Sequence, residues 1–160
     1  MQGLHLTADL GGCASDSAPM TDPSALRALC LEAVSGSGLQ AVNDLFHRFD
    51  PGPGITGVVL LAESHVAVHT WPEMGAVTLD VYVCNFGGDN TAAARLLMAT
   101  LVRAFEPELV KEHAIERGLT PSPTGGRGPH PSPLPRAGEE AGAVARAAAP
   151  PWNIASSKTE

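Results

Sequence analysis

Two β-rich segments on either side of a turn sequence constrain the fold of this chain more than any other feature. Residues 65–71 and 76–84 are rich in valine, threonine and aromatic side chains, and Pro72-Glu73-Met74-Gly75 lies between them. β-branched and aromatic residues favour strands, whereas proline and glycine favour turns. The pattern therefore predicts an antiparallel hairpin.

Apolar periodicity predicts the other elements. Asp22 followed by Pro23 is typical of a helix start, and the apolar residues after it recur at helical spacing until Gly36. A second helical pattern covers residues 91–105. Further strands are predicted at residues 4–10, 40–49, 55–62 and 108–117. Strands in hairpin order with two amphipathic helices predict an α+β fold, a two-layer sandwich of one mostly antiparallel sheet with the two main helices on one face.

The character of the sequence changes after residue 118. Residues 120–135 of the 160-residue chain contain six prolines, which are incompatible with strand ladders and leave little to bury in a core. We therefore predict one domain over residues 1–118 and a disordered tail over residues 119–160.

Charge and composition limit the classes of partner and compartment. The formal net charge is −7, which disfavours nucleic acid as a partner. No run approaches the ~18 apolar residues of a membrane span, and the N-terminus lacks a signal-peptide pattern. Three cysteines without a Cys-x-x-Cys pair suggest a reducing compartment. We expect a cytoplasmic protein that binds neither nucleic acid nor membranes.

The central block of the chain carries the functional signal. Glu63-Ser64-His65 is followed by His69-Thr70-Trp71-Pro72-Glu73 and then by Cys84. This combination resembles the S-adenosylmethionine decarboxylases of the short prokaryotic type, which cleave themselves and carry a pyruvoyl cofactor made from an internal serine. The resemblance begins in the segment 4–10 and fades near residue 118.

The resemblance implies that the bond between Glu63 and Ser64 breaks. Attack by the Ser64 hydroxyl on the Glu63 carbonyl turns the amide into an ester, and removal of the Ser64 α-proton then releases the Glu63 carboxylate. Hydrolysis of the resulting dehydroalanine leaves a pyruvoyl group at residue 64, so the working enzyme would consist of residues 1–63 and 64–160. The pyruvoyl carbonyl forms a Schiff base with the substrate amine and accepts the electrons released as carbon dioxide leaves. The implied product is the aminopropyl donor of spermidine synthesis.

His69 is the base that the resemblance assigns to self-cleavage, because imidazole titrates near neutral pH. If residues 64–69 are extended, five steps of about 3.3 Å place His69 on the order of 16 Å from Ser64, too far for proton transfer. His69 is therefore expected to act on Ser64 of a second copy. The resemblance implies the same arrangement, a twofold homodimer with shared active sites.

The hairpin register places Cys84 near the cleavage site. Counting outward from a turn at residues 72–75 puts Ser64 opposite Val83, one residue from Cys84. The resemblance makes Cys84 the acid that returns a proton to the substrate carbon after decarboxylation. The alternative is a small buried hydrophobic residue, and that is our prediction for Cys13 and Cys30.

Four further site residues are implied by the resemblance. Thr56 matches a hydroxyl residue that assists self-cleavage. Phe49 and Trp71 match aromatic residues around the adenine and the sulfonium, which a ring face attracts. Glu73 matches a carboxylate that accepts hydrogen bonds from the ribose hydroxyls. As alternatives, the first three could be ordinary strand or core residues and Glu73 a solvated turn residue.

No metal site is predicted. His65 and His69 lie four residues apart, but on a predicted strand, and no cysteine or acidic third ligand has suitable spacing. His5 and His47 are solitary in the sequence and are expected to be structural.

Two other functions stay open at the level of sequence. A pyruvoyl decarboxylase on the same scaffold acting on another amino acid, arginine or ornithine, would share Ser64 and His69. A non-catalytic relative would keep the fold and lose the cleavage.

Overall fold

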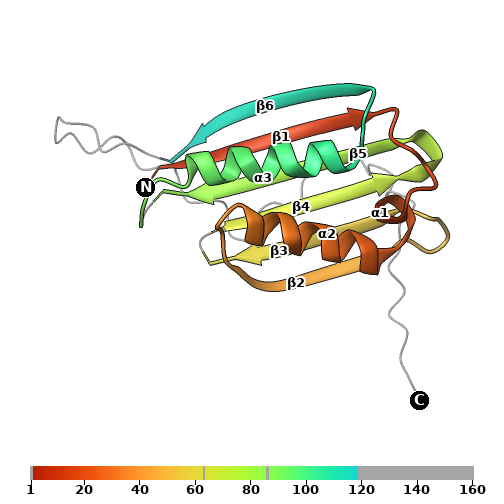
Figure 1. Ribbon diagram of the computed structural model, residues 1–160, viewed down its shortest axis with the longest axis horizontal. Helices are drawn as coiled ribbons and strands as arrows, with labels where there is room; N and C mark the ends of the chain where they lie inside the picture. Colours follow the sequence, from red (N-terminus) through yellow and green to blue (C-terminus); the bar gives the residue numbers. More distant parts are fainter. Residues whose placement is uncertain (1, 63, 86, 119–160) are drawn as a thin grey trace, which may run out of the picture. The chain divides into compact units, whose positions relative to one another are not determined.

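One antiparallel sheet runs through the computed structural model of the protein (Figure 1). The structure describes residues 2–62, 64–85 and 87–118, so the predicted tail lies outside the described residues. Within them, six strands lie in the order β2-β3-β4-β5-β1-β6, and all neighbours are antiparallel. The elements are β1 (Gly3–Gly11), α1 (Ala18–Thr21), α2 (Pro23–Gly36), β2 (Ala41–Arg48), β3 (Ile55–Leu61), β4 (Ser64–Trp71), the 3-10 helix η1 (Pro72–Met74), β5 (Ala76–Cys84), α3 (Thr91–Ala104) and β6 (Leu109–Arg117).

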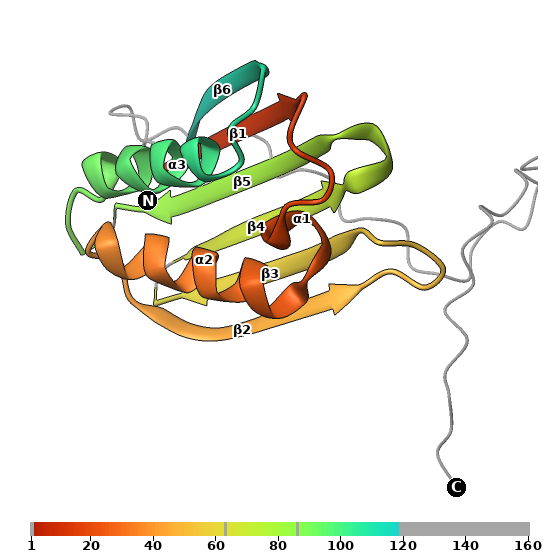
Figure 2. The same ribbon diagram turned by 45° about the vertical axis from the view of Figure 1, so that its right-hand side comes forward.

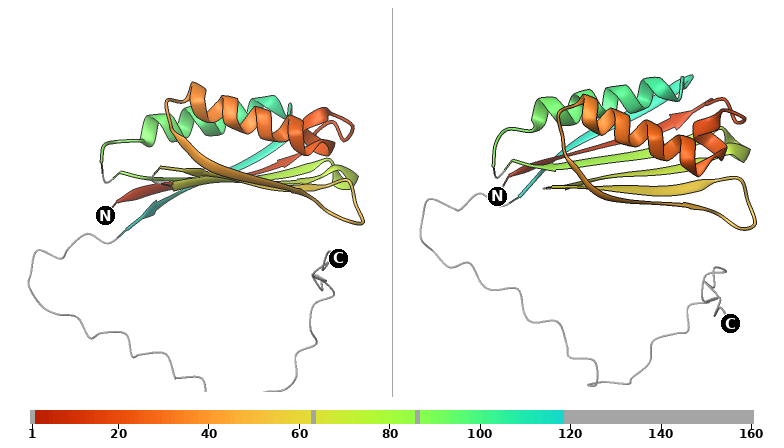
Figure 3. Two further views of the ribbon diagram at one scale, coloured as in Figure 1. Left: turned by 90° about the horizontal axis from the view of Figure 1, so that it is seen from below. Right: turned by 60° about the horizontal axis from the view of Figure 1, so that its bottom comes forward.

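Both long helices lie on the same face of the sheet (Figures 2 and 3). α2 contacts β2 and β3, α3 contacts β1 and β5, and the two helices contact each other. The predicted α+β two-layer sandwich is therefore confirmed.

The start of α2 also agrees with its prediction. The Asp22 carboxylate accepts a 2.9 Å hydrogen bond from the Ser24 amide, and Pro23 is the first helical residue. The short helix α1 was not predicted, because four residues are too few to show a helical period. Its Met20 is fully buried and belongs to the hydrophobic core.

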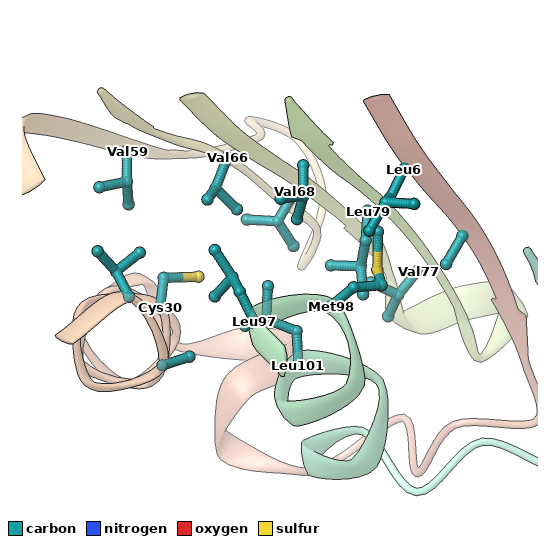
Figure 4. Close-up of a cluster of buried hydrophobic side chains, with 14 of the residues drawn as sticks. Leu6, Cys30, Val59, Val66, Val68, Val77, Leu79, Leu97, Met98 and Leu101 are labelled. Atoms are coloured by element: carbon teal, nitrogen blue, oxygen red, sulfur yellow. The ribbon is translucent and has the colours of Figure 1, made fainter. Parts of the chain in front are cut away.

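Alternate residues of the central strands form the core beneath the helices (Figure 4). The sheet contributes mainly branched aliphatic side chains, and the helices contribute longer ones and a thiol. Among these buried residues are Leu6, Cys30, Val59, Val66, Val68, Val77, Leu79, Leu97, Met98 and Leu101. Because the strand period is two, the same strands turn their other residues to the opposite face of the sheet.

The β4–β5 hairpin has the register expected from its turn. Trp71 pairs with Ala76 at the turn, and His65 pairs with Tyr82 at the far end. The next step outward is Ser64, the first residue of β4, which therefore lies beside the end of β5.

One hydroxyl in the core links three elements. Thr70 on β4 is fully buried; its hydroxyl donates to the Met20 carbonyl and accepts from the Ile55 amide, both at 2.9 Å. A buried backbone group that loses its partner carries the full cost of its desolvation.

The substitution Thr70→Val is therefore expected to lower the free energy of unfolding by about 1–3 kcal/mol, because Ile55 and Met20 would each lose a partner. Urea unfolding measures the change, in chains that also carry Ser64→Ala so that all stay uncut. Thr100→Val, on the half-exposed side of α3, is the control and should cost less than about 0.5 kcal/mol. Equal stability of the two variants would contradict this role for Thr70.

Candidate active site

The strand β4 divides its side chains between the two faces of the sheet. Val68 and Thr70 are buried beneath the helices, whereas His65, His69 and Trp71 are half-buried on the other side. We call this other side the open face, because α2 and α3 both lie on the opposite one (Figure 3). Three of its cross-strand rows are Asn43, Leu60, His65, Tyr82, His5 and Ile115; then Leu45, Val58, Ala67, Asp80, Thr7 and His113; then His47, Thr56, His69, Thr78, Asp9 and Lys111.

Thr56 and His69 meet near one end of the open face. They are cross-strand partners on β3 and β4, and the Thr56 hydroxyl lies 2.9 Å from Nδ1 of His69. The Trp71 ring lies next along β4, with its centroid 5.9 Å from that of His69. We call this group the histidine end of the sheet. With Nδ1 held by a hydroxyl, Nε2 of His69 is the nitrogen left to exchange a proton with another group.

Two other predicted site residues lie near the histidine end. Phe49 directly follows β2, and its ring stands edge-on to that of His47, with centroids 6.5 Å apart. Glu73 lies in η1, two residues after Trp71, and is exposed to solvent. Both side chains are accessible to a ligand bound at this end, because Phe49 is 39% exposed and Glu73 is also exposed.

Ser64 begins β4 at the opposite end of the sheet. It pairs with Leu61 of β3, and it lines a cavity of about 230 Å³ whose walls also include Leu39 and Asn90. Glu63 lies outside the described residues.

Cys84 ends β5 at the same end as Ser64. It pairs with Gly3 of β1, and its thiol lies 3.9 Å from the Gln2 carbonyl oxygen, to which it donates. A carbonyl acceptor suits the protonated thiol, the form that can give up a proton.

The other two cysteines are enclosed differently. Cys30 lies on the buried side of α2, where burial raises the pKa of its thiol to about 12. Burial also raises the pKa of the Cys13 thiol. Both thiols are therefore poorly ionised at neutral pH, as expected of packing residues.

His5, although solitary in the sequence, has close neighbours in the structure. Nε2 of His5 lies 3.2 Å from an Asp80 carboxylate oxygen, and its ring contacts those of Tyr82 and His65 at centroid distances of 5.8 and 6.4 Å. The Arg117 guanidinium lies over the Tyr82 ring. These residues come from four strands, and their meeting depends on the pairing of β1 with β5 and β6, which the sequence did not reveal. The described residues contain no cluster of three His, Cys, Asp or Glu side chains placed to bind a metal ion.

The predicted site residues thus fall into two groups. Thr56, His69 and Trp71 lie at the histidine end, and Ser64 and Cys84 lie at the other, which we call the cleavage end. Five steps along β4 separate Ser64 from His69, on the order of 16 Å in an extended strand. A single chain therefore does not bring its own His69 to its own Ser64.

Comparison with known proteins connects this arrangement to one family. Residues 4–118 match the family model described as S-adenosylmethionine decarboxylase. The S-adenosylmethionine decarboxylase proenzymes of Persephonella marina and of a Sulfurihydrogenibium species are 40% and 39% identical over 119 residues, which cover 74% of this chain and 84% of each relative. The crystal structure of the adenosylmethionine decarboxylase from Aquifex aeolicus is similar with a TM-score of 0.67 and 36% identity, over 76% of this chain and 95% of that one.

Proposed function

The chain belongs to the S-adenosylmethionine decarboxylase family, and we propose that it decarboxylates S-adenosylmethionine through a pyruvoyl group made from its own Ser64. The reaction supplies the aminopropyl donor for polyamine synthesis. The observation that carries the proposal is the position of Ser64 at the first residue of β4, beside the strand end that holds the Cys84 thiol.

The residues around position 64 fit a pyruvoyl group. When bound to substrate, such a group draws away the electrons that carbon dioxide leaves behind. Its ketone carbon would be the former α-carbon of Ser64, which belongs to the backbone of β4 and so lies in the sheet rather than on one face. Cys84 is one residue past Val83, the position level with Ser64 in the hairpin register, and it would supply the proton for the product.

The same residues account for the origin of the group. The Ser64 hydroxyl adds to the Glu63 carbonyl and displaces the amide nitrogen, which gives an ester. A base then takes the Ser64 α-proton, the Glu63 carboxylate leaves, and water replaces the nitrogen of the dehydroalanine as ammonia. We assign the base to His69.

His69 must then come from a second copy of the chain. The two ends of the sheet lie about 16 Å apart along β4. A twofold axis through the open face would place the histidine end of one protomer over the cleavage end of the other and create two equivalent sites. The apolar residues Leu45, Leu60 and Ile115 support an interface there, since they are 69%, 47% and 47% exposed.

The dimer also explains the placement of the predicted substrate contacts. Phe49, Trp71 and Glu73 would come from the partner together with His69. The aromatic faces would attract the sulfonium, and the Glu73 carboxylate would accept from the ribose hydroxyls.

Thr56 would orient His69 in the base form. If Nδ1 of His69 donates to the Thr56 hydroxyl, Nε2 is left unprotonated and can take the α-proton. The substitution Thr56→Val keeps the shape and removes this bond, so self-cleavage should slow by about tenfold. Thr56→Ser, which retains the hydroxyl, is the control and should cleave at nearly the original rate. Both rates follow from the fraction of cut chain over time on a denaturing gel, and equal rates for Thr56→Val and Thr56→Ser would remove this role.

We place the working enzyme in the cytoplasm, with residues 1–118 as the catalytic domain and residues 119–160 as an appended tail. Its three cysteines are free thiols, which suits a reducing compartment. Among the residues that the structure describes, no helix has both the length and the apolar character needed to cross a membrane.

Release of carbon dioxide from carboxyl-labelled substrates tests the choice of substrate. The cut protein should release label from S-adenosylmethionine and leave arginine and ornithine intact. Release from arginine or ornithine alone would contradict the substrate assignment while preserving the pyruvoyl chemistry. Release from none of the three by cut protein would contradict both.

A further inference from the structure

Asn90 stands at the N-cap position, directly before α3, but its side chain makes no capping hydrogen bond to the helix. The neighbouring Asp89 does so instead: its carboxylate accepts from the Thr91 amide at 2.9 Å. Hydrogen bonds from Thr91 lower the pKa of the Asp89 carboxyl, so it is ionised at neutral pH, as a good cap should be. The Asn90 side chain makes a hydrogen bond outside the helix instead.

That side chain turns back to the end of β5. Its Nδ2 donates to the Cys84 carbonyl at 2.9 Å. The backbone N–H of Asn90 donates to Oδ1 of the Asn85 side chain at 3.0 Å. The backbone N–H of Asn85 donates to the Gln2 carbonyl at 2.9 Å. The same Gln2 carbonyl accepts from the Cys84 thiol. Cys84 is therefore held through its backbone by Asn90 and through its thiol by Gln2, the residue directly before β1.

Asn90 also lies close to Ser64, the second residue of the cleavage end. It lines the cavity of about 230 Å³ that Ser64 lines. One residue thus lines a cavity with the residue that would become the pyruvoyl group and donates a hydrogen bond to the residue that would give the proton.

We infer that Asn90 is a positioning residue that fixes the Cys84 thiol relative to residue 64, so that the proton reaches the substrate carbon. This inference rests on the proposed function. Asn90 acts through its hydrogen bond to the Cys84 carbonyl, and a thiol at a strand end without that bond would sample more orientations.

The position of the thiol matters because two carbons compete for the proton. Protonation of the substrate carbon, followed by hydrolysis with one water, would give the decarboxylated amine and restore the ketone at residue 64. Protonation of the former Ser64 α-carbon, also followed by hydrolysis with one water, would leave the substrate nitrogen on residue 64 as alanine and release the rest of the substrate as an aldehyde. The second outcome inactivates the enzyme.

Asn90→Asp is the test substitution. Aspartate has the same size and caps helices as well as asparagine does, but it cannot donate to the Cys84 carbonyl. Asp89→Ala is the matched control, because it removes a bond to the first turn of α3 and leaves the Asn90 to Cys84 bond in place. A second variant without a side-chain donor, Asn90→Ala, serves if Asn90→Asp folds poorly, as judged by thermal unfolding.

The first readout uses uncut chains that carry Ser64→Ala, and so needs no pyruvoyl group. Alkylation of Cys84 by iodoacetamide, followed by peptide mass spectrometry, should be on the order of tenfold faster in Asn90→Asp than in the parent, with Asp89→Ala close to the parent. Cys13 and Cys30 are internal references, since burial raises the pKa of both thiols. Equal alkylation rates at Cys84 in all three chains would overturn the inference.

The second readout uses self-cleaved protein turning over S-adenosylmethionine. The fraction of chains with alanine at residue 64, per mole of product, should rise on the order of tenfold in Asn90→Asp and stay unchanged in Asp89→Ala. A parental ratio in Asn90→Asp would contradict the role of Asn90 even if the protein is a decarboxylase. Absence of cleavage in the parent chain would instead contradict the proposed function, and the alkylation result on uncut chains would still decide whether Asn90 positions Cys84.

Discussion

The substitution Ser64→Ala should leave every chain whole and abolish the release of carbon dioxide from S-adenosylmethionine. Alanine has no hydroxyl to attack the Glu63 carbonyl, so neither the ester nor the pyruvoyl group can form. Denaturing gels and intact mass measure the cut fraction, which should fall from most of the protein to none. The fold should survive, since Ser64 is a half-buried residue at the beginning of strand β4.

Ser64→Cys is the informative companion to this variant. A thiol can still attack the Glu63 carbonyl, so some cleavage should return. A pyruvoyl group would form at residue 64 only if the elimination step also follows the attack. Cleavage of Ser64→Ala at the parental rate would show that the scissile bond lies elsewhere or that another nucleophile cuts it.

Mixing two inactive chains should restore cleavage in one of them. The chain His69→Ala keeps Ser64 but lacks the base, and the chain Ser64→Ala keeps the base but cannot be cut. In a mixed dimer with shared sites, Ser64 of the first chain meets His69 of the second, so the His69→Ala chain becomes cut. With random pairing at equal amounts, about a quarter of all sites are whole.

The control for this mixture is a chain that carries both Ser64→Ala and His69→Ala. Its mixed dimers with His69→Ala contain no whole site and should stay uncut. Cleavage only in the first mixture supports sharing between protomers. Failure of the first mixture, with mixed dimers shown to form by a mass-tagged copy, would mean that His69 acts within its own chain.

Local sequence signals accounted for most of the elements but not for their order in the sheet. The register of the β4–β5 hairpin follows from its turn, because a short connection fixes which residues can pair. The place of β1 between β5 and β6 depends on contacts between residues far apart in the sequence, such as His5 with Tyr82 and with Ile115. No local pattern marks such a pairing.

The candidate site shows the same division. The sequence singled out Ser64, His69 and Cys84, and the distance along a strand already separated the first two. The contact between Thr56 and His69 depends on the register of β3 against β4, and Ala62 and Glu63, the two residues between these strands, are not typical turn residues that would mark a hairpin in the sequence. Asn90 was missed because an asparagine before a helix is an ordinary cap in sequence, and only its hydrogen bond to the Cys84 carbonyl distinguishes it.

The mass of the purified wild-type protein, measured after expression and long incubation, tests the account most directly. We predict two polypeptides, residues 1–63 and residues 64–160, the second with a ketone in place of its N-terminal amine and therefore resistant to Edman degradation and reactive with hydroxylamine. A single uncut polypeptide, or a second fragment that begins with an ordinary serine amine, would contradict it.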